Sequence, residues 1–382
     1  MNKKLLRTAL PMLSLLTLVA LACTCGGLLD EPTPTPAPEP TLVTLVPTKV
    51  GAPTLVPTKA GVPTTAPTRA SQPTQAGGQA PFKLSATPFV HKSGAFSVQL
   101  PDGWKVEERS TGVFASSADS VGSVDISFVN TGTQLDAKEV MNYVDAFEKN
   151  FFATYTNYKL SDKKTLSDGC VFAMKTLATK SGVAKSVGTY YCYNTSVMFQ
   201  QDFWADTSAF SQYATPFDQV SNSMKSNSTA AAKSPAYAET YTFTDLNKKF
   251  EFKVPYSWKY ERTKGTSTNV DTFTSPDGAS VFQNITYDDG KTVTQSESGK
   301  FALKLLKDVY KLTDIVITED KVQKDGSERL TWYSNAQGIK GQSFFETRGS
   351  TFLMLSWIAN TGDYNTFSPV WDVLLDSYKI PK

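Results

Sequence analysis

The chain has 382 residues, enough for two ordinary domains and additional segments. Its 38 lysines and arginines nearly balance its 36 aspartates and glutamates, which argues against a dedicated nucleic-acid or polyanion binder. Phe, Tyr and Trp make up 12% of the residues and lie mostly beyond residue 81, so that part of the chain can bury a substantial core.

The first 22 residues have the features of an export signal. A basic start, MNKKLLR, precedes an apolar stretch that is short for a membrane span. The sequence ALAC at residues 20–23 resembles the cleavage site of a bacterial lipoprotein, although it lacks a Leu three residues before the cysteine. We expect a signal peptide over residues 1–22 and a lipid on Cys23 that anchors the chain to the outside of the bacterial cell membrane. An ordinary secretory signal and an uncleaved anchor are the alternatives.

Residues 23–81 are predicted to form a disordered stalk. The stretch from Glu31 to Pro81 holds 12 of the 21 prolines and no aromatic residue, and it contains a ten-residue repeat, VPTK, VPTK and APTR. Such a segment buries too little apolar surface to offset its chain entropy, and its prolines favour extended conformations. A glycosylated, mucin-like segment is the alternative interpretation.

Beyond the stalk, the pattern of apolar residues becomes that of a folded domain. The segment AFSVQL alternates, so that Phe96, Val98 and Leu100 share one face of a half-buried strand. Further strands are predicted at GVFASS, at GSVDISFVN, and near residues 169–179, 186–194 and 196–205.

Two helices are predicted in this first copy. Thr133 is the expected N-cap of a long helix, and TPFD predicts a short last helix with Thr215 as its cap and Pro216 in its first position. The apolar face of the long helix consists of Val140, Val144, Phe147 and Phe151.

The same order of elements recurs in the second half of the chain. GAFSVQLPDGWKVEE (residues 94–108) returns as KKFEFKVPYSWKYER (residues 248–262), an offset of 154 residues that places Trp258 where Trp104 stood. We expect an offset of 153 to 154 residues up to the last helix, where Ser368 and Pro369 stand for Thr215 and Pro216. This constancy indicates a duplication.

The long helix of the second copy has a clearer start. Thr294 and Glu297 have the spacing of a capping box, which predicts the first turn of this helix. Its expected apolar face consists of Phe301, Leu305, Val309 and Leu312.

These elements predict an α+β fold. Runs of strands interrupted by one long helix indicate layering of helices on a sheet, and hairpin connections imply a mainly antiparallel sheet. We therefore predict two tandem α/β/α sandwiches, each a mainly antiparallel sheet flanked by helices, after the disordered stalk. The predicted segments are a signal peptide (1–22), a stalk (23–81), a first domain (82–228), a linker (229–238) and a second domain (239–382).

Several short motifs together resemble the PsbP-like family, which shares an α/β/α sandwich with the Mog-type Ran-binding proteins. They are the opening FSVQLPDGW, the strand and turn FASS or FTSPDG, the single long helix, the paired hairpins and the closing SMK or SYK. Plant members of this family help photosystem II to retain calcium and chloride through N-terminal residues for which this chain has only stalk. The Ran-binding relatives work inside eukaryotic cells, which an export signal excludes. The resemblance covers both copies and implies a noncatalytic accessory or binding module, with no binding residue carried over.

The sequence offers few residues for catalysis. His91 is the single histidine, lies at the border of stalk and domain, and is expected to be a solvated loop residue rather than the base of a triad. Neither a phosphate-binding loop nor a Cys/His cluster occurs, so we expect no cofactor and no metal site. Asp288 and Asp289 before Gly290 could contribute to a calcium site, but an acidic turn is the simpler interpretation.

The cysteines and tryptophans are interpreted structurally. Cys170 and Cys192 lie on successive strands around a turn centred near Ser181, so antiparallel pairing would bring them opposite each other. Export permits their oxidation, and a disulfide here would contribute about 3 kcal/mol; two separately buried thiols are the alternative. Trp104 and Trp258 are expected to anchor the two cores, whereas exposed aromatic residues would indicate a platform for sugars or peptides. The other tryptophans, interpreted in the same way, are Trp204, Trp332, Trp357 and Trp371.

The favoured hypothesis is therefore a membrane-anchored extracytoplasmic lipoprotein that acts as a noncatalytic binding or assembly module. We expect a monomer that binds an unknown protein or cell-surface partner and no nucleic acid, with no catalytic residue. The alternatives are an extracytoplasmic hydrolase that uses carboxylates and a structural spacer. A deep pocket with two close acids would favour the hydrolase, and an apolar patch shared by both copies would favour binding.

Overall fold

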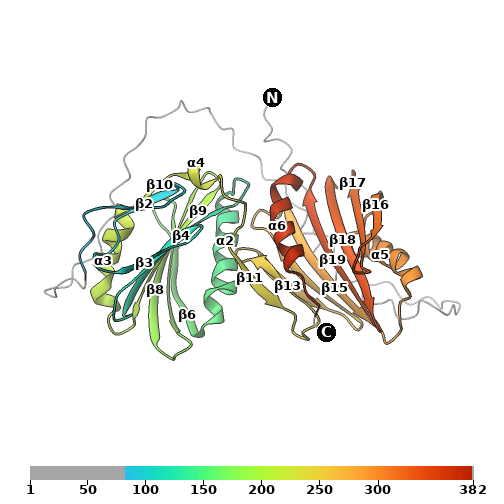
Figure 1. The fold of residues 1–382 in the computed structure, drawn as a ribbon, viewed down its shortest axis with the longest axis horizontal. Helices are drawn as coiled ribbons and strands as arrows, with labels where there is room; N and C mark the ends of the chain where they lie inside the picture. Colours follow the sequence, from blue (N-terminus) through green and yellow to red (C-terminus); the bar gives the residue numbers. More distant parts are fainter. Residues whose placement is uncertain (1–81, 381–382) are drawn as a thin grey trace, which may run out of the picture.

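The computed structural model describes residues 82–380, which form two similar domains (Figure 1). The predicted signal peptide, the stalk and Cys23 lie outside the described residues. The first half contains β1 (Phe89–Val90), β2 (Phe96–Val98), β3 (Lys105–Glu108), β4 (Gly112–Ser116), β5 (Gly122–Asn130), α2 (Ala137–Asn150), η3 (Phe152–Thr154), β6 (Thr156–Thr165), β7 (Val171–Ala178), β8 (Ala184–Asn194), β9 (Val197–Asp206), α3 (Phe210–Ser223), β10 (Lys225–Ser226) and α4 (Ser228–Ala231). The second half contains β11 (Thr240–Thr244), β12 (Glu251–Pro255), β13 (Lys259–Lys264), β14 (Thr268–Thr274), β15 (Ser280–Asp288), α5 (Gln295–Tyr310), β16 (Val316–Val322), β17 (Glu328–Ser334), β18 (Ile339–Arg348), β19 (Thr351–Asn360) and α6 (Tyr364–Ser377).

Each domain is built on a seven-stranded antiparallel sheet. The strand orders are β3-β4-β5-β9-β8-β7-β6 and β13-β14-β15-β19-β18-β17-β16, so the two sheets have the same topology and each takes its strands from one half of the chain. The predicted fold class, two tandem domains with mainly antiparallel sheets flanked by helices, is confirmed. Between residues 82 and 380, no helix is long and apolar enough to cross a membrane.

The layers follow one another along the long axis of the molecule (Figure 1). In the first domain α3 and the small sheet β1-β2-β10 cover one face of the large sheet, and α2 covers the other. In the second domain α6 and the two strands β11-β12 cover the face toward α2, and α5 covers the outer face. The chain begins its described course at the outer end of the first domain, where the ring of Phe82 contacts Trp104, Tyr213 and Phe217.

One apolar core is shared by the two domains. Side chains of α2 and of the first sheet belong to the same buried cluster as side chains of β12, α6 and the second sheet. The rings of Phe147 in α2 and of Phe151, which caps the end of that helix, have centroids 5.6 and 5.3 Å from that of Tyr256. Asn150 Nδ2 donates hydrogen bonds to the carbonyl oxygens of Tyr256 and Trp258, at 2.7 and 2.8 Å. The two sheets are separate, but the two domains also pack against each other through a buried apolar contact, in addition to their connection along the chain.

Three of the four predicted helices start elsewhere than predicted. Asp136, not Thr133, caps α2, because Asp136 and Glu139 form a reciprocal capping box while Thr133 donates to Asp277 of the second domain. The capping box of Thr294 and Glu297 in α5 is confirmed.

The two last helices begin earlier than the prolines suggested. α3 starts at Phe210 and α6 at Tyr364, so Pro216 and Pro369 lie inside the helices, and the predicted caps Thr215 and Ser368 are helical residues. The first turn of each helix carries an aromatic residue that packs on the core, and this packing outweighs the preference of proline for the first position.

The offset between the two copies is not constant. β19 and α6 follow β9 and α3 by 154 residues (351 against 197 and 364 against 210), but α5 follows α2 by 158 residues (295 against 137). The difference arises at the first hairpin, where Lys105 pairs with Ser116 but Lys259 pairs with Thr274, so the second-domain hairpin is four residues longer. The predicted uniform offset of 153 to 154 residues is therefore wrong between these points.

Candidate functional site

His91 is a buried structural residue, so its predicted exposure is wrong. Only 1% of its surface is accessible, and its ring stacks on Phe96 at 5.1 Å. Nε2 donates to the carbonyl oxygen of Arg109 at 3.0 Å, and Nδ1 lies 2.7 Å from the hydroxyl of Ser93. Both ring nitrogens therefore have hydrogen-bond partners. These bonds hold the first residues of the domain against the turn that contains Arg109.

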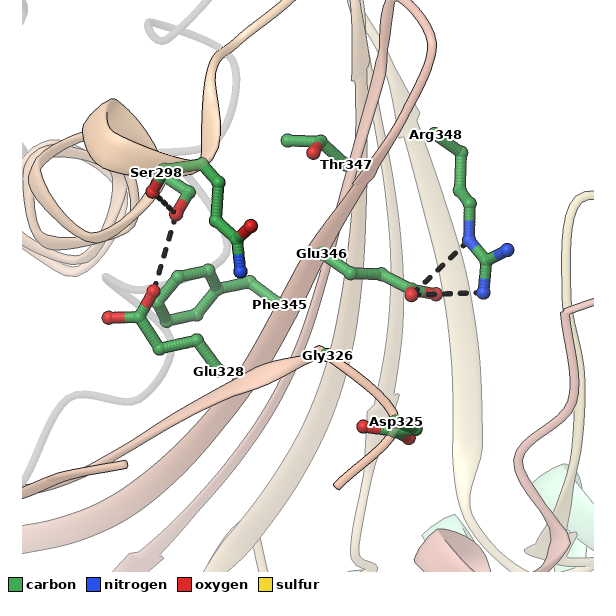
Figure 2. Close-up of a pocket in the computed structure, with 9 residues that line it drawn as sticks. Ser298, Asp325, Gly326, Glu328, Phe345, Glu346, Thr347 and Arg348 are labelled. Carbon is green, nitrogen blue, oxygen red and sulfur yellow. Dashed lines mark hydrogen bonds and ion pairs between the residues drawn. The ribbon is translucent and has the colours of Figure 1, made fainter. Parts of the chain in front are cut away.

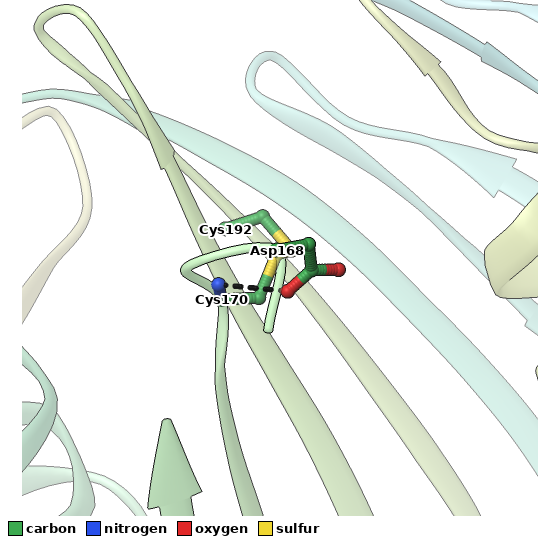
Figure 3. Close-up of a disulfide and its surroundings, with 3 residues drawn as sticks. All are labelled: Asp168, Cys170 and Cys192. Atoms are coloured by element: carbon green, nitrogen blue, oxygen red, sulfur yellow. Dashed lines mark hydrogen bonds between the residues drawn. A yellow bond between two sulfur atoms is a disulfide. The ribbon is translucent and has the colours of Figure 1, made fainter. Parts of the chain in front are cut away.

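The predicted disulfide between Cys170 and Cys192 is present (Figure 3). The register of β7 and β8 pairs Val171 with Tyr191, which places the two cysteines directly opposite each other with Cα atoms 4.3 Å apart. The carboxylate of Asp168, in the turn before β7, accepts a hydrogen bond from the backbone N–H of Cys170. The disulfide therefore closes the end of the β7–β8 hairpin.

A pocket opens at the corresponding place in the second domain (Figure 2). It has a volume of about 250 Å³ and lies between the start of α5, the turn before β17 and the end of β18. Its lining consists of Gln295, Ser298, Asp325, Gly326, Glu328, Phe345, Glu346, Thr347 and Arg348. A second hollow of about 420 Å³ shares Gln295 and Glu328 with it and extends along α5 toward Asp320.

Differences between the copies account for the pocket in the second domain. At the offset of 158 residues that applies to the long helices, Val140 and Met141 of α2 correspond to Ser298 and Gly299 of α5. At the offset of 157 residues between β7 and β17, Val171 corresponds to Glu328. Val140 and Val171 are core residues in the first domain, and Met141 packs against them. Smaller or charged residues at these positions leave the space beneath the helix unfilled.

The cysteine positions differ in the same way. The turn that holds Asp168 and Cys170 in the first domain holds Asp325 and Ser327 in the second, with the same hydrogen bond from the second residue's N–H to the aspartate. The strand pairing that joins Cys170 to Cys192 places Ser327 opposite Glu346. The positions that form the disulfide in the first domain therefore lie at the opening of the pocket in the second domain.

The pocket presents more negative than positive charge. Hydrogen bonds from the hydroxyl and the N–H of Ser327 keep the pKa of Asp325 below its usual range, so this carboxylate is ionised at neutral pH. Glu346 is paired with Arg348, whose Nη2 lies 3.1 Å from Oε2 (Figure 2). Glu328 accepts a hydrogen bond from Ser298 at 3.3 Å, and burial, together with the neighbouring Asp320, raises its pKa.

The first domain contains instead a buried polar network beneath α2. Lys175 Nζ pairs with Glu148 of α2 and donates to Thr189 Oγ1 at 2.9 Å. Thr189 Oγ1 in turn donates to Asp202 Oδ1 at 2.7 Å, and Gln200 donates to the other carboxylate oxygen at 2.8 Å. Because Lys175, Thr189, Glu148 and Asp202 are all buried, this network has the character of core structure rather than of a reactive site.

The second domain repeats this arrangement without its charges. Trp332 Nε1 donates to Ser343 Oγ at 3.0 Å, and the hydroxyls of Ser343 and Ser356 lie 2.9 Å apart. These three residues occupy the positions of Lys175, Thr189 and Asp202, and Leu306 occupies that of Glu148. Three hydrogen-bonded side chains therefore occupy equivalent positions in both domains. They include charged groups in the first domain and only neutral groups in the second.

The tryptophans are mostly core residues, as predicted. Trp258, Trp332, Trp357 and Trp371 are buried. Trp104 and Trp204 are half-buried, so the repeated pair of Trp104 and Trp258 has unequal surroundings.

The acidic turn before Gly290 is held by protein groups. Asp288 accepts a hydrogen bond from Thr351 at 2.9 Å and lies 3.3 Å from Lys249 Nζ; the Thr351 bond chiefly lowers its pKa to about 2. Asp289 accepts from the hydroxyl of Tyr287 at 3.1 Å. Among the described residues, no three Asp, Glu, His or Cys side chains are grouped closely enough to hold a metal ion.

Comparison with known proteins gives distant matches to solved structures. No family model matches the chain, and no curated protein matches it. It is similar to PsbP from the cyanobacterium Synechocystis, with 16% identity and a TM-score of 0.32 over 38% of this chain and 94% of that one. It is also similar to the Ran-binding protein Mog1p from Saccharomyces cerevisiae, with 11% identity and a TM-score of 0.29 over 39% of this chain and 99% of that one. A Pseudomonas aeruginosa protein of unknown function matches with 10% identity and a TM-score of 0.26, over 37% of this chain and 96% of that one.

Two of these matches are proteins of the kind that the sequence motifs resemble. Their TM-scores are below 0.5, so nothing about the function of this chain is inferred from them. The resemblance to the PsbP-like family stays an interpretation of the motifs.

Proposed function

We propose that the chain is a noncatalytic binding or assembly module and that its second domain holds the binding site. The observation that supports this assignment is the pocket between α5, β17 and β18, at the place that a disulfide and packed valines close in the first domain. In the first domain this place is filled by valine side chains and closed by the disulfide, whereas in the second domain it is an accessible polar recess. A duplicated fold permits this division, because one domain can keep the structural role while the other changes.

The ligand proposed for the pocket is a positively charged group, such as a basic side chain of a partner protein. The carboxylates of Asp325 and Glu328 face the recess, and the one guanidinium in the lining, that of Arg348, is already paired with Glu346. A cation placed there would gain charge-assisted hydrogen bonds. A carboxylate or phosphate ligand would meet a surplus of like charge.

The test is binding of a tri-arginine peptide, measured by calorimetry at low salt. We expect the double variant D325N/E328Q to bind the peptide at least 10-fold more weakly than the wild-type chain, because both changes remove negative charge from the recess. The matched control is D168N, which alters the same turn in the first domain. Equal affinity of all three proteins would exclude the pocket as the binding site.

The proposal includes export and a lipid anchor on Cys23. A disulfide between Cys170 and Cys192 agrees with an oxidising compartment outside the cytoplasm. We expect C23S to move the chain from the membrane fraction to the soluble fraction of the producing bacterium and to remove the mass of the lipid. Unchanged fractionation and unchanged mass would contradict the anchor, whatever the outcome at the pocket.

A hydrolase that uses carboxylates is the second candidate function. The feature in its favour is the pair of Glu328 and Asp320, which both line the second hollow; burial, and next the neighbouring Asp320, raise the pKa of Glu328. A protonated and an ionised carboxyl are the two groups that glycoside hydrolysis needs. Turnover of a chromogenic glycoside by the wild-type chain, but not by E328Q or D320N, would favour this candidate over the binding module.

A further inference from the structure

Carboxyl groups meet at the contact between the two domains. Glu239, in the segment just before β11, accepts a hydrogen bond from Thr111 Oγ1 in the β3–β4 turn at 3.2 Å. Arg109 of the same turn pairs with Asp125 in β5. Asp125 lies directly opposite Asp202 of β9 in the sheet, on the face that α2 and the second domain cover. Glu239 of the second domain is therefore bonded to the same turn of the first domain whose Arg109 pairs with Asp125, the neighbour of Asp202 in the sheet.

The groups around Glu239 and Asp202 include more acids than bases. The acids are Asp125, Glu148, Asp202 and Glu239, and the bases are Arg109 and Lys175. Burial, with the charge of Glu239 as a second cause, raises the pKa of Tyr143 in α2 and of Tyr256 after β12. If all four acids were ionised, two negative charges would be left without a cation, in a region where Asp202 and Glu148 are buried and Asp125 and Glu239 are half-buried.

Two of these acids keep their protons close to neutral pH. Burial, with the nearby charge of Asp125, raises the pKa of Glu239 to about 7, against the opposing effects of the Thr111 hydrogen bond and of Arg109. Burial likewise raises the pKa of Asp202 to about 7, although Lys175 acts in the opposite direction. Both groups change charge near neutral pH, so the charge at the contact depends on pH.

We propose that this acid cluster makes the contact between the two domains sensitive to pH, so that the domains hold together in acid and loosen as Glu239 ionises. In an opened molecule Glu239 would be solvated and would have an ordinary pKa of about 4.3. The closed state therefore binds the proton more tightly. By linkage, its advantage is full below about pH 4 and is lost as the pH rises to about 7.

The test is hydrogen exchange of the full chain, followed by mass spectrometry at pH 5.5 and pH 8, with exchange times scaled for the chemical rate. Peptides from α2 and from residues 254–260 report on the contact, and peptides from α5, which lies on the far face of the second sheet, are the internal reference. For the wild-type chain we expect the protection at the contact to fall at least 10-fold more than the protection of α5.

The deciding variant is E239Q, which keeps a side chain of the same shape without the titrating group. We expect its loss of protection between the two pH values to shrink to less than 3-fold. D102N, which changes an exposed carboxylate of the first domain, should behave like the wild-type chain. A full pH-dependent loss in E239Q would overturn the proposal. So would equal losses at the contact and in α5, or an E239Q contact that is open at both pH values.

Discussion

Replacing Lys175 with alanine is expected to lower the free energy of unfolding by about 3–5 kcal/mol. The side chain of Lys175 is fully buried, with its ammonium paired with Glu148, bonded to Thr189 and 3.5 Å from the ring centre of Phe152. Removing the lysine leaves the carboxylate of Glu148 in the core without its cation. This unpaired buried charge is the main reason for the lower free energy of unfolding. E148L should cost a similar amount, because it leaves the ammonium unpaired instead.

The second domain suggests the control for this prediction. There Trp332 and Leu306 occupy the positions of Lys175 and Glu148, so the site accepts a neutral pair. The double variant K175M/E148L should recover most of the lost stability, to within about 1 kcal/mol of the wild-type chain. Urea unfolding followed by circular dichroism at pH 6 measures all four proteins. Additive losses in the double variant would mean that Lys175 and Glu148 contribute independently, and would contradict the prediction.

Replacing Trp258 with alanine is expected to cost about 3–5 kcal/mol. Its side chain is fully buried at the contact between the domains, stacked on Phe282 at 4.5 Å and in contact with Tyr237 at 5.7 Å. Its carbonyl oxygen, which the alanine variant keeps, accepts a hydrogen bond from Asn150, so residue 258 lies directly against the first domain. The change would therefore leave a cavity that weakens both the second core and the contact.

The matched change is W104A, at the same position of the first copy. Trp104 is half-buried and packs on Phe82 and Tyr213 at the outer end of the molecule. Its loss should cost about 1–2 kcal/mol, because less apolar surface is withdrawn from water there. Thermal and urea unfolding of the two variants would measure the difference. Equal costs would mean that the two copies use their repeated tryptophan in the same way.

The sequence was sufficient for the architecture because the strands and helices that face the core carry regular apolar patterns. The exceptions have identifiable causes. The apolar pattern does not predict β6, because β6 is an edge strand whose side chains are mostly polar and exposed. Its pairing with β7 also has two register shifts. His91 was misplaced because its burial depends on Phe96, Ser93 and Arg109, which meet it only in the folded domain.

The candidate site was not predicted, because it lies in a difference between the copies. With the uniform offset of 154 residues, Val140 of the long helix aligns with a residue other than Ser298, and Val171 with one other than Glu328. Aligning the capping boxes at Asp136 and Thr294 gives the correct offset for the helix. That signal was present in the sequence and would have shown a polar residue replacing a core valine. The network around Lys175 could not have been found in this way, because its members come from α2 and three strands.

Phe82, the first described residue, lies at the outer end of the first domain, so the preceding part of the chain joins the molecule at that end. The pocket lies beside α5, at the opposite end of the long axis (Figure 1). With the lipid proposed on Cys23, the tether would pull on the disulfide-bridged domain, which would face the bilayer. The recess would then lie on the domain that is more distant along the chain from the lipid.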